Sequence, residues 1–121
     1  MNNCIFCKIA NRDIPSKILY EDDKVLVFLD VNPDTAGHTL IIPKKHYKDI
    51  DDIDDDTYMH IFKIAKKIKN LLTNKLNCDG ITLIQNNGDC QEIKHYHLHL
   101  RPYYKNQVQI DLDEVYEKIM N

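Results

Sequence analysis

The segment HYHLHL at residues 95–100 places a histidine at every second position and holds three of the six histidines in the chain. Side chains alternate between the two faces of a β-strand, so this spacing predicts a strand with His95, His97 and His99 on one face. The tyrosine and leucines between them would lie on the other face and pack on a core. Pro102 cannot donate a ladder hydrogen bond and suits the end of this strand.

A row of imidazoles on one strand face has two common uses. The rings can bind a metal through neutral nitrogens, or they can supply the nucleophile, acid and base of a reaction near neutral pH. Three solvated histidines on an open sheet face are the alternative, but three in register are more than random composition explains. We therefore expect the functional site on this face.

The size and charge of the chain exclude several classes of protein. Its 121 residues fit a single domain over 1–121, and 43% hydrophobic and 29% charged residues are typical of a globular protein. A net charge of −3 argues against a nucleic-acid-binding surface. With neither a secretory signal nor a long apolar run, the sequence predicts a cytoplasmic protein without a membrane partner. The modest core favours a homodimer.

The order of the expected elements indicates the fold class. Residues 4–13 read as a short helical turn with Ile5, Phe6 and Ile9 pointing inward. A hairpin has arms at 17–20 and 25–30, and HTLIIP at 38–43 forms a third strand. Apolar residues at helical spacing predict a long helix over 56–76, preceded by six aspartates within 49–57 near its positive N-terminus.

The second half of the chain completes this pattern. Gly80 precedes a strand over 81–85, which is followed by a turn at NNGD and by the histidine strand. A short helix closes the chain, with Asp111 as its N-cap. Hairpin links and one long helix predict an α+β fold: an antiparallel β-sheet with one long helix and a short C-terminal helix.

Three blocks of the sequence occur together in one known family. HYHLHLRP closely resembles the histidine-triad (HIT) signature, in which three histidines alternate with apolar residues. The blocks CIFCKI, DIPSKILYEDDKVLVFLDVNPDTAGHTLIIPKKHY and NNGDCQEIKHYHLHL follow the order of that family. The resemblance implies a small antiparallel sheet with a long helix, usually dimeric. It also implies an enzyme that hydrolyses or transfers nucleotides by attack on an α-phosphate, with a purine nucleotide conjugate as its substrate.

The resemblance also implies the catalytic residues. His97, the middle histidine, matches the family nucleophile and would form a nucleotidyl-histidine intermediate that water then hydrolyses. A backbone carbonyl near the histidine strand would hold the other nitrogen of His97 and fix its tautomer. His99 would bind the phosphate, and His38 matches the fourth histidine of the family. Gln91 matches a family glutamine and would contact the phosphate or the leaving group.

The nucleoside site follows from the same resemblance. Asp30 would accept hydrogen bonds from both ribose hydroxyls, a role that suits a carboxylate with two oxygens. Asn86 would donate to the phosphate or the ribose. The base would lie among apolar side chains: Ile5, Phe6, Ile9, Phe28 and Val31.

The chain departs from the family pattern beside the triad. Glu92 stands where many phosphoramidase-type members have serine, so the leaving-group preference does not carry over. The loop before the triad is about two residues shorter than is common in the family. Arg101-Pro102-Tyr103 replaces the usual apolar-Pro-Arg ending, so that a family arginine is displaced or absent.

A second motif indicates a metal. The CIFC segment is half of a tetrahedral zinc site, although on its own it also fits a redox pair or two buried thiols. Some bacterial members of the family pair these cysteines with two histidines. The matching residues here are Cys4, Cys7, His46 and His95, and the resemblance implies a structural zinc. Cys78 and Cys90 lack such partners and are expected to be ordinary thiols.

Two other functions remain open from the sequence. The triad histidines could all bind one catalytic zinc with water as the nucleophile, which a chelator would test. The chain could instead be a nucleotide-binding scaffold with little turnover. Activity on adenosine phosphoramidate or a dinucleoside polyphosphate would separate these functions.

Overall fold

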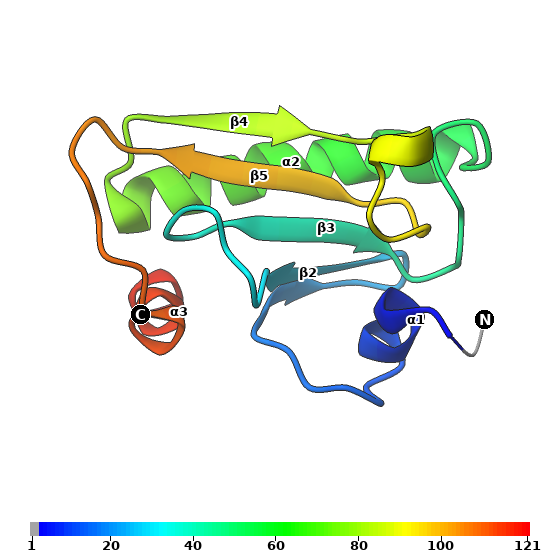
Figure 1. Cartoon of the computed structure of the whole chain (residues 1–121), viewed down its shortest axis with the longest axis horizontal. Coiled ribbons are helices and arrows are strands. Elements are labelled where there is room, and N and C mark those ends of the chain that lie inside the picture. The colour runs from blue at the N-terminus through cyan, green and yellow to red at the C-terminus, as the bar shows by residue number, and fades with distance from the viewer. Residues whose placement is uncertain (1–2) are drawn as a thin grey trace.

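A single antiparallel sheet with the strand order β1-β2-β3-β5-β4 forms the centre of the molecule (Figure 1). The computed structural model describes residues 3–121. Within this range the elements are α1 (Ile5–Ala10), β1 (Ile18–Glu21), β2 (Val25–Leu29), β3 (Thr39–Pro43), α2 (Asp55–Leu76), β4 (Gly80–Ile84), β5 (Leu98–Tyr103) and α3 (Leu112–Met120). A 3-10 turn spans Gly88–Cys90. This is the predicted α+β class, with the expected order of elements.

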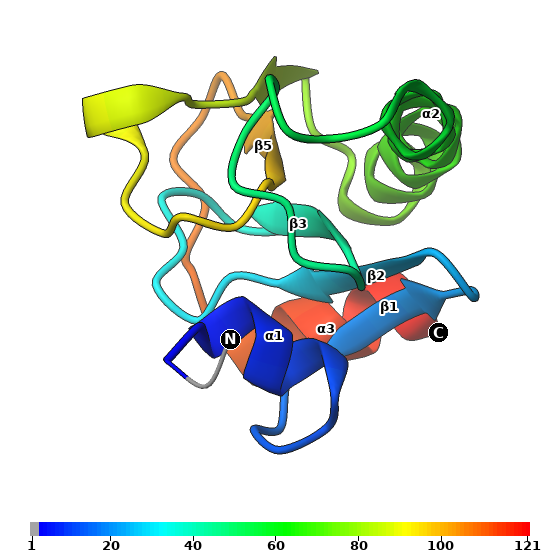
Figure 2. The same ribbon diagram turned by 90° about the vertical axis from the view of Figure 1, so that its right-hand side faces the viewer.

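The two faces of the sheet carry separate hydrophobic cores because the strand side chains alternate. Val25, Val27 and Leu29 of β2 point to the face that α2 and α3 cover. Leu26 and Phe28 point to the opposite face and pack against α1. Figure 2 shows α1 and α2 on different sides of the strands. The long helix therefore covers one face, and the other face is left for α1 and the site.

The ends of α2 are set by local side chains. Asp54 is the N-cap, and its Oδ2 accepts a hydrogen bond from Thr57 N at 3.2 Å. Tyr47 OH donates to the other oxygen of Asp54 at 2.6 Å. Asn77 ends the helix in the left-handed conformation with φ 53°. No helix among residues 3–121 is long and apolar enough to span a membrane.

The histidine strand begins later than the sequence predicts. The β5 strand starts at Leu98 and continues through Pro102 to Tyr103, so His95 and His97 precede it. Its neighbour β3 ends at Pro43, which has no N–H to extend the ladder, and Pro43 O instead accepts from the His95 ring at 2.8 Å. The expected strand over 95–100 is therefore wrong at both ends, although the alternation of faces holds.

Most other expected elements agree with the structure to within one or two residues. Asp111 caps α3 by accepting from Glu114 N at 3.1 Å, as predicted. Phe6 and Ile9 are buried as expected. Ile5 is not, because 44% of it stays exposed: a helix of six residues turns only part of its surface to the sheet.

Candidate functional site

A pocket of about 570 Å³ opens on the sheet face that carries the histidines. It is bounded by α1, the segment before β1, the loop from Asp30 to His38, the β5 face and the segment from Ile84 to Ile93. Predicted site residues that line it are Ile5, Phe6, Ile9, Phe28, Asp30, Val31, His38, Asn86, Glu92, His97 and His99. The fold thus brings together side chains from the two halves of the chain.

His97 lies at the inner wall of this pocket and is 5% exposed. Its Nδ1 is 2.7 Å from the carbonyl oxygen of His95, a hydrogen bond in which the ring nitrogen must be the donor. In the neutral ring the proton is therefore on Nδ1, and Nε2 keeps its lone pair. The ring of Phe6 packs edge-on against it with centroids 5.0 Å apart. The arrangement presents an oriented nucleophilic nitrogen.

His38 and His99 form a hydrogen-bonded pair next to His97. Asp34 N donates to His38 Nδ1 at 3.2 Å, so the neutral His38 ring carries its proton on Nε2. That nitrogen lies 2.9 Å from His99 Nδ1 and donates to it. His99 in turn keeps its proton on Nε2. The two bonds leave His99 Nε2–H as a free donor, and the His99 ring lies 4.8 Å from the His97 ring between centroids.

Burial keeps these rings neutral. Burial is the main cause that lowers the pKa of His97, although its bond to the His95 carbonyl and the charges of Asp30 and Glu92 act in the opposite direction. Burial also lowers the pKa of His38, and it lowers that of His99 to about 4, with help from the neighbouring histidines and Arg101. At pH 7 the site therefore contains neutral imidazoles.

The loop after β2 brings Asp30 and His38 together. Asp30 N donates to His38 O at 2.9 Å, and Asp30 Oδ2 lies 3.7 Å from His38 Nε2. Gly37 precedes His38 with φ +90°, a backbone conformation that residues with a side chain rarely adopt, and a Cβ at this position would also clash with Leu76. Glycine is thus required for the turn that sets the position of His38.

Of the other predicted site residues, Asn86, Glu92 and Val31 line the pocket and Gln91 does not. Asn86 and the exposed Glu92 both line the pocket, and Val31 is 66% exposed at its rim. Gln91 does not line it: the side chain is buried and its Nε2 donates to Lys48 O at 2.6 Å. The structure therefore places Gln91 behind the pocket, where it holds the segment after β3 instead of facing a ligand.

Arg101 and Cys90 also line the pocket, although neither was predicted from the sequence as a site residue. Arg101 follows His99 by two residues on β5 and so shares its face, a signal present in the alternation itself. Cys90 comes from the 3-10 turn before the triad. Only the conformation of that turn decides that Cys90, and not Gln91, faces the pocket.

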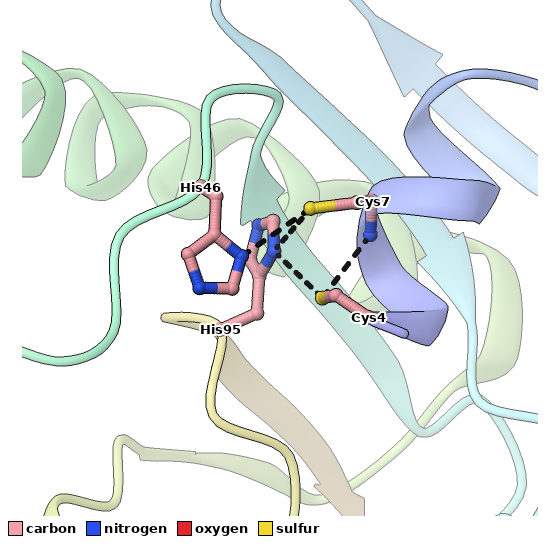
Figure 3. A group of neighbouring side chains, drawn as sticks. All are labelled: Cys4, Cys7, His46 and His95. Carbon is pink, nitrogen blue, oxygen red and sulfur yellow. Dashed lines mark hydrogen bonds between the residues drawn. The ribbon is translucent and has the colours of Figure 1, made fainter. Parts of the chain in front are cut away.

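A second cluster lies at the N-terminal end of α1 and contains the four predicted metal ligands (Figure 3). Cys4 Sγ is 3.3 Å from His95 Nδ1, and Cys7 Sγ is 3.3 Å from His46 Nδ1 and 3.5 Å from His95 Nδ1. The ligand atoms of all four residues lie within 4.8 Å of one another. The cluster joins α1, the loop after β3 and the segment before β5.

The geometry of the cluster fits a tetrahedral zinc ion. Bonds of about 2.3 Å to sulfur and 2.0–2.1 Å to nitrogen place tetrahedral S and N ligands about 3.6 Å apart. The bond from His95 Nε2 to Pro43 O, at 2.8 Å, leaves the lone pair on Nδ1, which faces the thiols. Burial and the Cys4 side chain raise the pKa of Cys7 to about 11, so a metal that binds here must displace the thiol proton.

The three triad rings do not converge on one point. His95 Nδ1 faces the cysteines, whereas His97 Nδ1 donates to the His95 carbonyl. Asp30, His38 and His99 form another group of potential ligands, but the two rings are already hydrogen-bonded to each other at 2.9 Å. The geometry does not favour a single metal bound by all three triad histidines.

Comparison of the sequence with known proteins gives consistent matches. A sequence model of the family described as HIT domain matches residues 11–106. A HIT-like protein of Methanocaldococcus jannaschii is 44% identical, with 96% of this chain and 98% of that protein covered. A Saccharomyces cerevisiae protein named adenosine 5'-monophosphoramidase is 42% identical over 82% of this chain and 61% of its own length. One from Arabidopsis thaliana named adenylylsulfatase is 38% identical over 84% of this chain and 52% of its own.

Solved structures share the whole fold. A Hit-like protein from Bartonella henselae superposes with a TM-score of 0.89 and 36% identity, covering 98% of this chain and 95% of the other. A histidine triad family protein from Mycobacterium smegmatis, described as Zn-bound, has a TM-score of 0.90 and 31% identity, with coverage of 98% and 91%. The arrangement of strands and helices is therefore shared with these proteins.

Proposed function

Because the chain belongs to the HIT domain family, which includes nucleotide hydrolases, we propose that it hydrolyses or transfers a purine nucleotide conjugate through His97. The observation that carries the proposal is the 2.7 Å bond from His97 Nδ1 to the His95 carbonyl, since it leaves Nε2 as the nucleophile. The substrate class is a nucleoside phosphoramidate or a dinucleoside polyphosphate.

The reaction proceeds in two displacements at the α-phosphorus. The Nε2 lone pair of His97 forms a bond to phosphorus while the bond to the leaving group breaks, and the leaving group takes up a proton from solvent. Water then attacks the phosphorus of the nucleotidyl-His97 intermediate and loses a proton to solvent, while the P–N bond breaks and returns its electron pair to Nε2. His99 donates its Nε2–H to a non-bridging oxygen, and His38 holds His99 in that tautomer.

We expect the other pocket residues to bind the ribose, the base and the phosphate of the nucleotide. Asp30 accepts the ribose hydroxyls, and Asn86 donates to the phosphate or the ribose. The base lies between α1 and the strand face, in contact with Ile5, Phe6, Ile9, Phe28 and Val31. Glu92 also lines the pocket, where many phosphoramidase-type members have serine, and we expect it to alter the leaving-group preference. Gln91 is left out of the catalytic set because its amide is bonded to Lys48 O.

The covalent intermediate provides the direct test. The protein is mixed with adenosine phosphoramidate or a dinucleoside polyphosphate and quenched in denaturant at alkaline pH, where a phosphorus–nitrogen bond survives. Mass spectrometry should find a nucleotide adduct on His97. His97→Ala should lose the adduct and several orders of magnitude in rate, whereas His60→Gln, a histidine change on α2, should keep both. An adduct on another residue of an active enzyme would refute the role of His97.

We further propose that Cys4, Cys7, His46 and His95 bind one structural zinc ion. The S···N distances of 3.3–3.5 Å support it, and so does the bond that orients His95. The ion would tie α1, which carries Phe6 and Ile9 of the pocket, to the two strand ends. All four ligand positions come from the protein, so no open position remains for substrate.

We also propose that the protein is a homodimer located in the cytoplasm. The β4 strand is at the edge of the sheet and exposes Leu83, a surface that a second copy can cover.

A further inference from the structure

The pocket is lined by more negative than positive side chains, which is unusual for a site that binds phosphate. Three of its lining side chains are acidic: Asp30, Asp34 and Glu92. Among the described residues that line it, Arg101 is the one lysine or arginine. His99 adds no charge at pH 7 because burial lowers its pKa to about 4. A nucleotide would therefore meet mostly negative charge, except where it meets Arg101.

The guanidinium of Arg101 has unused hydrogen-bonding capacity. Its Nε is buried and lies 3.3 Å from Asp34 Oδ2, but in a geometry that makes no hydrogen bond. Neither terminal nitrogen has a hydrogen-bond or ion-pair partner within residues 3–121. The side chain as a whole is 35% exposed, so a ligand in the pocket can reach it. Buried polar groups are rarely left without a partner. The paired N–H groups of a guanidinium match the oxygens of a phosphate.

The strand register places this group next to the proposed phosphate site. His99 and Arg101 succeed one another on the same face of β5, and positions two apart on a strand are separated by about 6.8 Å. His99 pairs with Ile84 of β4, and Arg101 pairs with Thr82. A long arginine side chain spans the distance to a phosphate held beside His99.

We propose that Arg101 is the anion-binding residue of this pocket: its guanidinium contacts the phosphate oxygens of a nucleotide held beside His99, and Asp34 opposes that contact. The inference rests on the proposed function and deepens it. The site then selects nucleotides over nucleosides by charge, and the Arg101–Asp34 pair sets the strength of that selection. Arg101 acts on binding, and His97 on the chemical step.

Calorimetric binding of adenosine and AMP tests this without any turnover. Arg101→Leu should weaken AMP binding roughly 10- to 100-fold and leave adenosine binding unchanged, because only AMP loses a charged contact. Arg101→Lys should retain part of the affinity. Asp34→Asn should tighten AMP binding roughly 2- to 5-fold, since it removes the competing carboxylate while keeping the backbone bond to His38.

The outcomes separate the role of Arg101 from the proposed function. Equal loss of AMP and adenosine binding in Arg101→Leu, or no change in AMP binding, would overturn the role of Arg101 and leave the proposed function standing. Failure of the wild-type protein to bind AMP would overturn both. Tighter AMP binding in Asp34→Asn together with weaker binding in Arg101→Leu supports the inference, because a change of packing would not give effects of opposite sign.

Discussion

At the residue scale, the site depends on which nitrogen of each imidazole carries the proton. Backbone groups make this choice: the His95 carbonyl for His97 and the Asp34 N–H for His38. Both partners belong to the chain itself and not to a ligand. Under the proposed function, the donor and the nucleophile are therefore oriented before substrate binds, and little reorganisation is needed during the reaction.

The His38–His99 pair predicts how activity responds to acid. The bond from His38 Nε2 requires a neutral His99, whose pKa burial lowers to about 4. A group with a lowered pKa stays neutral until the pH falls toward that value, so kcat/KM should change little from pH 8 to 6. It should then fall as the pH approaches 4. The check is a pH profile of kcat/KM with zinc content measured at each point; an acidic limb near 6.5, the ordinary value for histidine, would contradict it.

At the element scale, α1 is too short to be stable by itself. A helix of six residues in isolation is unfavourable, and α1 is held by Phe6 and Ile9 on one side and by its two cysteines on the other. The longer helix α2 has its own caps and a wide apolar face. The end of the pocket that we propose for the nucleoside is thus built on α1, a helix that depends on contacts with the rest of the molecule.

Replacing one of the proposed metal ligands tests whether the zinc site holds α1 in place. Cys4→Ser should lower the zinc content and reduce Tm by roughly 10 °C, because metal binding contributes directly to folding. Activity measured at low temperature should largely remain. The matched control is Cys90→Ser, an exposed thiol outside the cluster, which should keep its zinc. If His97→Ala empties the metal site and Cys4→Ser does not, the metal is catalytic and the structural assignment is wrong.

At the scale of the whole molecule, the open sheet has two edge strands, β1 and β4, among the described residues. In the order β1-β2-β3-β5-β4, the β4 strand has a hydrogen-bonded neighbour on one side only. Leu83 in this strand is 44% exposed. An unprotected edge with an exposed leucine favours association with a second copy.

Light scattering at micromolar concentration should therefore give about twice the chain mass of 14.3 kDa. Leu83→Glu should shift the protein toward the monomer, because it places a charge on the apolar edge. Ile110→Glu is the matched control, since Ile110 is 43% exposed but lies before α3. A wild-type mass of 14.3 kDa would contradict the homodimer.

The sequence by itself determined the order of elements and the alternation of His97 and His99, because both follow from local periodicity. The Cys4-x-x-Cys7 spacing indicated half of a metal site, and His46 and His95 joined it only through the resemblance to the family. Tertiary structure alone decided where β5 begins, because that depends on Pro43 in a strand more than fifty positions away. It also decided that Gln91 turns to Lys48 while Arg101 lines the pocket. The direction of a loop side chain and the neighbours of a strand side chain both depend on residues brought close only by folding.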